Sequence, residues 1–200
     1  MEKEFMDFKA RGSFFAEIRK NGKLIETIEK HNLIVNTSCK IIAKLLAGAR
    51  VALPVFDNQI VKLGVGSFAD PSTIFTNYTS SPDKTELDGD SPTFYKYFVK
   101  IENNQCVPNN DGGVPGVNYC DIIYDESNNP NDVIYQFYIG TSECNRTGGN
   151  NIWEFGLFSD DSTMFSMLTR LDMGKNYPIV KDETVDISGY WKIQIRNTSV

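Results

Sequence analysis

The last quarter of the chain constrains the fold most, because apolar and polar residues alternate there over a long run. In segment 183–197, Trp191, Ile193 and Ile195 share one parity, and the residues between them, Lys192 and Gln194, are polar. A period of two places successive side chains on opposite faces of a strand. The pattern therefore predicts a strand whose Trp191, Ile193 and Ile195 side chains face a hydrophobic core.

Two apolar segments precede that strand, and they predict an antiparallel pair. Segments 151–159 and 163–171 are joined by Asp160-Asp161, which is a typical turn composition. The residues of the first segment that we expect in the same core are Trp153, Phe155 and Leu157.

Further strands are predicted upstream. Asn21-Gly22 separates two β-type segments, and this dipeptide favours the type I′ turn of a hairpin. Shorter strand patterns follow, and they lie at 58–67, 93–104, 119–124 and 133–140. Six or more strands with turn signals between them are typical of a mostly antiparallel β-sandwich.

One segment departs from the β pattern and predicts an amphipathic helix at about residues 36–48. Its apolar side chains form one stripe, Asn36 or Thr37 can cap its start, and Gly48 suits its end. Long polar loops are expected at about 68–93 and 102–118, where Pro, Gly, Ser and Asn dominate. We therefore predict a mainly β fold, an antiparallel β-sandwich with one helix, forming a single domain over residues 1–200.

Composition argues against several classes of partner. Nucleic-acid binding needs clustered Lys and Arg, whereas the net charge here is −6 and no basic run exists. No window reaches the roughly 20 apolar residues that a membrane-spanning helix requires. The first ten residues are charged and unlike a signal peptide, so we expect synthesis in the cytoplasm.

Metal binding has little support in the sequence. The four cysteines, Cys39, Cys106, Cys120 and Cys144, form no C-x-x-C pair, and His31 is the sole histidine. Free thiols are the expected state, with a Cys106–Cys120 or Cys120–Cys144 disulfide as the alternative. Asp88-Gly89-Asp90 lacks the remaining ligands of a calcium loop. We expect no cofactor.

Catalytic motifs are missing as well, and we expect no enzyme. The sequence holds no G-x-S-x-G and no phosphate-binding glycine loop. Glu154 is unusual, because this carboxylate lies between Trp153 and Phe155 in an apolar run. We interpret it as a buried structural partner of Arg170 or Lys175, a polar lock that would fix strand register.

Three segments, in this order, resemble a widespread group of small structural proteins of tailed phages. They are HNLIVNTSCKIIAKLLAG, IVKLGVGSFADPS, and WEFGLFSDDSTMFSMLTRL followed by DISGYWKIQI. That group occupies baseplates, tail-fibre attachment points and nearby tail or neck positions. The matching residues of the C-terminal pattern are Ile152, Glu154, Gly156, Leu157, Phe158, Arg170, Lys175, Trp191 and Ile193. Residues from about 70 to 145 carry none of the pattern.

The resemblance implies a virion protein that assembles through symmetric contacts with copies of itself and with other virion proteins. The long loops would then reach neighbouring subunits, with Phe75, Tyr78 and Tyr119 as candidate interface residues. A second hypothesis is a carbohydrate- or receptor-binding module of a tail fibre, which exposed aromatic side chains gathered on one face would favour. A third is a glycan-cleaving enzyme, which would need two carboxylates about 5–10 Å apart in a cleft.

Overall fold

The chain is mainly β, and every strand pair is antiparallel. A computed structural model describes residues 8–34, 60–68, 87, 94–103, 105–109, 119–125, 127–145, 150–159, 167–173 and 178–197, and within these ranges there is no helix. The strands are β1 (Phe8–Lys20), β2 (Lys23–Ile34), β3 (Ile60–Phe68), β4 (Phe94–Tyr97), β5 (Val99–Glu102), β6 (Gln105–Pro108), β7 (Asp121–Tyr124), β8 (Asp132–Ile139), β9 (Asn150–Ser159), β10 (Met167–Asp172), β11 (Ile179–Lys181) and β12 (Val185–Asn197).

The predicted N-terminal hairpin is confirmed. β1 and β2 pair around Asn21 and Gly22, whose φ angles of 50° and 74° are those of a type I′ turn. The register shifts next to Ile18, so that Ile25 becomes the extra residue of a β-bulge.

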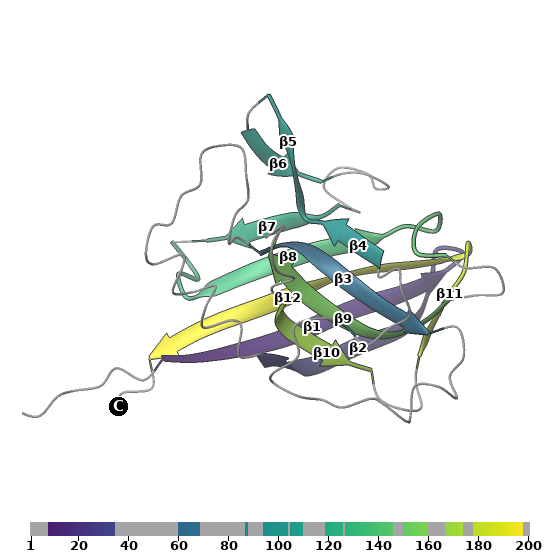
Figure 1. The fold of residues 1–200 in the computed structure, drawn as a ribbon, viewed down its shortest axis with the longest axis horizontal. Coiled ribbons are helices and arrows are strands. Elements are labelled where there is room, and N and C mark those ends of the chain that lie inside the picture. The colour runs from purple at the N-terminus through teal and green to yellow at the C-terminus, as the bar shows by residue number, and fades with distance from the viewer. Residues whose placement is uncertain are drawn as a thin grey trace, which may run out of the picture.

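Ten strands form one sheet, in the order β4-β3-β9-β10-β2-β1-β12-β8-β7, with β11 on β9. The two longest strands, β1 and β12, come from opposite ends of the sequence and pair over their whole length (Figure 1). β2 meets β10 only at Ile34–Thr169 and Leu33–Arg170, where the sheet turns a corner.

The two halves of this sheet pack face to face around an aromatic core. Phe14 of β1 lies 5.0 Å from the ring of Phe155 in β9, and 5.3 and 5.5 Å from the rings of Trp191 and Phe137. All four side chains are buried, and burying each contributes on the order of 1.5–3 kcal/mol. In Figure 1, β3, β9 and β10 accordingly lie over β1 and β12.

Asn109 joins the two ends of the strand path, β4 and β7. Its backbone N–H donates to the carbonyls of both Phe98 (3.0 Å) and Cys120 (2.9 Å), and its carbonyl accepts from the Cys120 N–H. Its side-chain amide donates to the carbonyl of Tyr97 at 2.9 Å. One buried asparagine therefore connects both halves of the sheet on the side opposite the β2–β10 corner.

Several sequence predictions need correction. The predicted loop at 102–118 contains strand β6, which forms a two-stranded hairpin with β5. The single strand predicted at 93–104 is interrupted at Phe98, whose buried side chain marks the change from β4 to β5. The short strand β11 was missed, because three residues after a proline give no detectable period. The predicted helix at 36–48 lies outside the described residues, as does nearly all of the predicted loop at 68–93.

Ile195 also differs from the prediction, because 42% of its side chain is exposed. It has the parity of Trp191 and Ile193, which are buried, but it lies near the end of β12, beyond the facing half of the sheet. Alternation fixes the direction of a side chain, whereas burial also requires a neighbour above it.

Candidate functional site

The structure places Glu154 and Arg170 together as a fully buried ion pair. The carboxylate oxygen Oε2 of Glu154 accepts from Nε of Arg170 at 2.9 Å and from Nη2 at 2.6 Å. The two side chains are 0% and 2% exposed, although Asp and Glu are almost never fully buried unless paired. Lys175, the alternative partner, lies outside the described residues.

Both side chains of the pair lie on the face of β9 and β10 that is opposite the aromatic core. Arg170 is paired with Gly156 across the strands, while the adjacent pair, Leu171 and Phe155, points into the core. A second buried cluster, Leu87, Phe158 and Met167 with Tyr95 against it, covers this outer face.

A glycine on the neighbouring strand makes room for the carboxylate. Gly66 of β3 is paired with Glu154, and a Cβ atom at Gly66 would overlap the Glu154 side chain. The space left by the missing side chain of Gly66 is therefore filled by the Glu154 side chain. A buried pair adds little net stability but is costly to break, so a register of β9 and β10 that separated Glu154 from Arg170 would be disfavoured.

The other candidate site is a groove on the outer face of β1, β12 and β8, with a volume of about 250 Å³. Strand register arranges its side chains in two rows that cross three strands. Phe15, Tyr190 and Gln136 form one row, and Glu17, Ser188 and Tyr138 form the next. We call this the outer-face groove, and its lining residues are Phe15, Glu17, Tyr119, Gln136, Phe137, Tyr138, Ser188, Gly189 and Tyr190.

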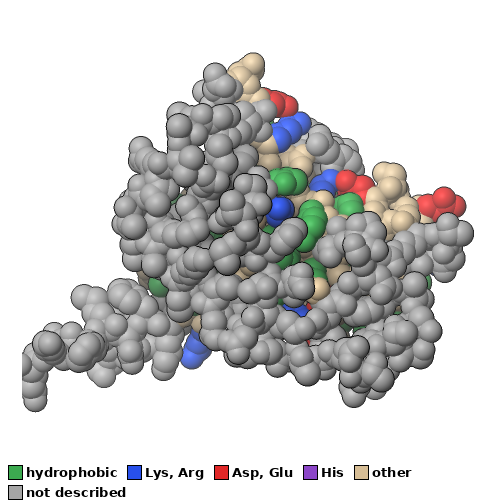
Figure 2. All heavy atoms as spheres, viewed as in Figure 1, with side chains coloured by type: hydrophobic (Ala, Val, Ile, Leu, Met, Phe, Trp, Pro, Cys, Tyr) green, Lys and Arg blue, Asp and Glu red, His purple; other side chains and the backbone are tan. Residues whose placement is uncertain are grey.

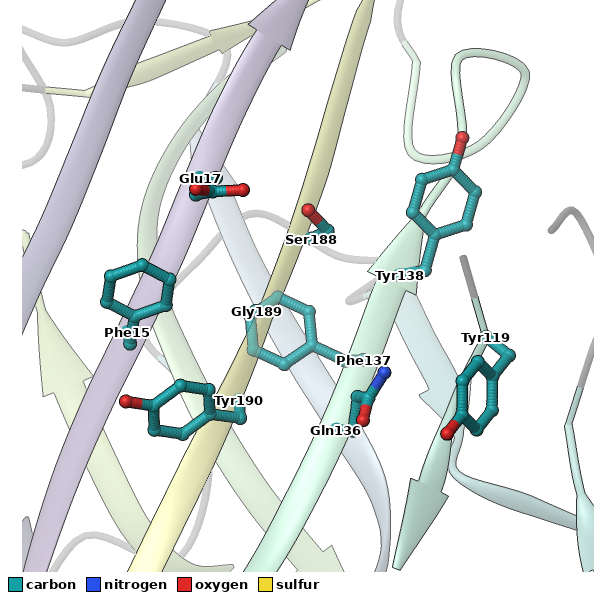
Figure 3. A pocket seen from close by; sticks show the side chains of 9 residues that line it. All are labelled: Phe15, Glu17, Tyr119, Gln136, Phe137, Tyr138, Ser188, Gly189 and Tyr190. Atoms are coloured by element: carbon teal, nitrogen blue, oxygen red, sulfur yellow. The ribbon is translucent and has the colours of Figure 1, made fainter. Parts of the chain in front are cut away.

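Aromatic rings form the two sides of the outer-face groove. Phe15 and Tyr190 stack with ring centroids 5.2 Å apart and an angle of 18° between their planes. Figure 3 shows this pair on one side, Tyr119 and Tyr138 on the other, and Gln136 between them. Tyr190 is 39% exposed, so its ring remains available to a ligand.

Arg19 holds the polar row of the groove in place. Its guanidinium donates to Oγ of Ser188 at 2.8 Å and forms an ion pair with the Glu17 carboxylate. These contacts fix the rotamers of two lining side chains before any ligand arrives, which lowers the entropic cost of binding.

Charges of both signs lie near the Tyr138 end of the groove. Burial raises the pKa of the Tyr138 hydroxyl, and the nearby carboxylates of Asp186 and Glu143 raise it further, whereas Arg19 opposes them. Burial likewise raises the pKa of Asp186. The lining residues of the groove include one carboxylate, Glu17, and no Lys or Arg, so they offer an anionic ligand no positively charged partner.

Two buried lysines organise the turn that follows β8. Lys96 of β4 donates to Glu143 at 2.5 Å, and the Glu143 carboxylate also accepts from the Gly140 N–H. Lys181 of β11 donates to Oδ1 of Asn145 at 2.8 Å and to the Asp182 carbonyl at 2.9 Å. Burial lowers the pKa of Lys181, and these hydrogen bonds offset part of the cost of removing its ammonium group from water.

Another turn with a charged side chain, Asp182–Thr184, lies directly after β11. The Thr184 hydroxyl and the Thr184 backbone N–H both donate to the Asp182 carboxylate. These two hydrogen bonds, the hydroxyl's more strongly, hold the pKa of Asp182 below its usual value. Asn21 donates its N–H to the Thr184 carbonyl at 2.8 Å, so the hairpin tip of β1 and β2 rests against this turn.

The other predicted residues are distributed as follows. Trp153, Phe155, Leu157, Trp191 and Ile193 are buried, and Tyr119 lines the outer-face groove. Phe75 and Tyr78 lie outside the described residues, as do Cys39 and Asp88-Gly89-Asp90. Cys120 and Cys144 are not joined by a disulfide.

Sequence reasoning did not find the outer-face groove. The signal was present, because Phe15 and Tyr190 occupy the outward parity of strands whose inward parity is already apolar. Only the β1–β12 register, which joins residues 175 positions apart, puts them side by side.

The described part of the chain offers no cluster of three or more metal-ligating side chains, and no helix long and apolar enough to span a membrane is found in it. In the face shown in Figure 2, the described Lys and Arg side chains are scattered and form no single patch. No family model, curated protein or solved structure matches this chain.

Proposed function

We propose that this chain is a non-catalytic structural protein of a tailed-phage particle, built on a β-sandwich scaffold and located in the tail, baseplate or neck. It would be made in the host cytoplasm and act through contacts with copies of itself and with other virion proteins. The residues that carry the resemblance support this proposal by their position. Eight of the nine are buried, and the ninth, Lys175, lies outside the described residues.

The observation that carries the proposal is an exposed aliphatic end of the molecule. Leu24 and Ile25 of β2 are 54% and 58% exposed, and Val180 of β11 is 56% exposed. The Asn21–Thr184 hydrogen bond brings the hairpin tip to the turn after β11, and Figure 1 shows both at the same end. We call Leu24, Ile25 and Val180 the aliphatic end.

Its exposure has a structural cause. The bulge at Ile25 puts two consecutive aliphatic residues into solvent, and no described strand pairs with β2 between Lys23 and His31 on the side away from β1. Exposed aliphatic side chains with charged neighbours such as Lys20 and Asp182 are typical of protein–protein contact sites.

Sedimentation of the purified full chain tests the proposal. We expect an oligomer, which Leu24→Ser with Ile25→Ser converts to a monomer without loss of β-structure. Tyr124→Ser is the matched control, because Tyr124 is 56% exposed but lies on β7. A wild-type chain that stays monomeric at high concentration would contradict self-assembly. An oligomer that the double substitution leaves unchanged would contradict assembly through the aliphatic end.

A second candidate function is recognition of a carbohydrate or receptor, as in a tail-fibre module. The observation that favours it is the clustering of Phe15, Tyr190 and Tyr119 in the outer-face groove. A glycan-cleaving enzyme is less well supported by the same groove, because its lining carboxylate, Glu17, is held by Arg19.

A further inference from the structure

We propose that the outer-face groove binds a neutral sugar ring, a pyranose of an uncharged glycan, with the stacked Phe15–Tyr190 pair as its platform. This inference is independent of self-assembly, which the aliphatic end carries on other strands.

The platform has the geometry that a sugar ring needs. The two stacked rings, with an angle of 18° between their planes, form one continuous apolar surface, and Tyr190 keeps 39% of its surface exposed. The face of an aromatic ring is electron-rich, and the axial C–H groups on one side of a pyranose are weakly positive. A pyranose therefore lies with its C–H side against the ring, which leaves its hydroxyl groups to be met by polar side chains.

Those polar side chains stand next to the platform by register. Gln136 is directly across from Tyr190, and its amide offers both a donor and an acceptor, as a sugar hydroxyl does. Ser188 and Glu17 form the adjacent row, and Arg19 holds both in position. The rings of Tyr119 and Tyr138 limit the groove on its far side (Figure 3).

The lining of the groove offers no cation to an anionic ligand. Its one carboxylate, Glu17, is paired with Arg19, and the nearby Glu143 is paired with Lys96, while no Lys or Arg is among the lining residues. A phosphate, a sulfated sugar or a sialic acid would therefore find no positively charged partner in the lining, whereas a neutral hexose or N-acetylhexosamine needs none.

The position of the groove within the sheet excludes an added peptide strand. β12 is paired with β1 on one side and with β8 on the other over these same residues, so its backbone groups are already used. A ligand here must be held by side chains alone. The volume of about 250 Å³ is below the roughly 300–1,000 Å³ of pockets that enclose drug-sized molecules, which suits a single ring of a longer chain.

The experiment is a screen of the purified full chain against immobilised neutral oligosaccharides built from hexoses, 6-deoxyhexoses and N-acetylhexosamines, with sialylated and sulfated oligosaccharides alongside. Calorimetry then measures the affinity of the best neutral probe. We expect Tyr190→Ala to weaken that affinity by about tenfold. We expect Gln136→Ala to weaken it as well, and Tyr190→Phe, which keeps the platform, to have a smaller effect than Tyr190→Ala.

Tyr124→Ala is the matched control, since it removes an exposed tyrosine from β7, outside the lining of the groove, and should leave the affinity unchanged. Circular dichroism and thermal unfolding establish that each variant is folded. Three results would overturn the proposal: no neutral probe binds, an anionic probe binds best, or a bound probe is insensitive to Tyr190→Ala. A dimer of the chain that Tyr190→Ala dissociates would also overturn it, because the groove would then be filled by a second copy.

Discussion

Breaking the Glu154–Arg170 pair should cost far more stability than breaking a pair at the surface. In Glu154→Gln the Arg170 guanidinium stays 2% exposed but loses the carboxylate that it contacts at 2.6 and 2.9 Å. Removing one partner of a buried pair costs roughly 3–5 kcal/mol. This is a large part of the roughly 5–15 kcal/mol by which a domain is stable.

Urea unfolding measures this loss directly. With a slope of about 2 kcal/mol per molar urea, the expected shift of the unfolding midpoint is about 2 M. The matched control is Glu102→Gln, because Glu102 contacts Lys100 at 3.0 Å but its side chain is 56% exposed. That change should cost less than about 1 kcal/mol.

The double variant Glu154→Met with Arg170→Met distinguishes the cost of leaving one charge unpaired from the net contribution of the pair. Two unbranched apolar side chains follow the same paths without charge, so the double variant should lie within about 2 kcal/mol of the wild type. Equal costs for Glu154→Gln and Glu102→Gln would refute the reasoning. So would a double variant that loses as much as the two single variants together.

Three further predictions concern single positions. Gly66→Ala should lower the free energy of unfolding by about 1–3 kcal/mol in urea titrations, because its Cβ would overlap the Glu154 side chain; an unchanged midpoint would show that the strands shift freely. The pKa of Asp182 is lowered in the fold, so its stabilisation is present above the usual value of 3.8 and is lost as the pH falls through the lower folded value. Asp182→Asn should therefore flatten the fall in thermal unfolding temperature at acid pH, and an identical acid profile would contradict this. Iodoacetamide should modify the partly buried Cys144 before the fully buried Cys120, as peptide mapping would reveal, whereas equal rates would mean that β7 opens readily.

The sequence predicted the strands whose residues alternate regularly. The hairpin at Asn21-Gly22 and the strands around Trp153 and Trp191 follow from the period of two and from turn chemistry, both of which are local. The Glu154–Arg170 contact was also predictable, because a carboxylate within an apolar run must find a cation nearby.

The remaining features depend on contacts between distant parts of the chain. The end of burial at Ile195, the Asn109 junction and the outer-face groove are set by which strands become neighbours, and no local pattern encodes that choice. The same holds for the opening beside Glu154, since Gly66 has meaning only once β3 lies against β9.

The most direct test of the proposed function is crosslinking and imaging of the purified tailed-phage particles in which the chain is proposed to assemble. The account predicts several copies of the chain in a symmetric ring at the tail, baseplate or neck. Crosslinks from Lys20 and Lys23, which flank the aliphatic end, should reach a neighbouring subunit. A chain that is absent from the particles, or that occurs in them with the aliphatic end facing solvent, would contradict it.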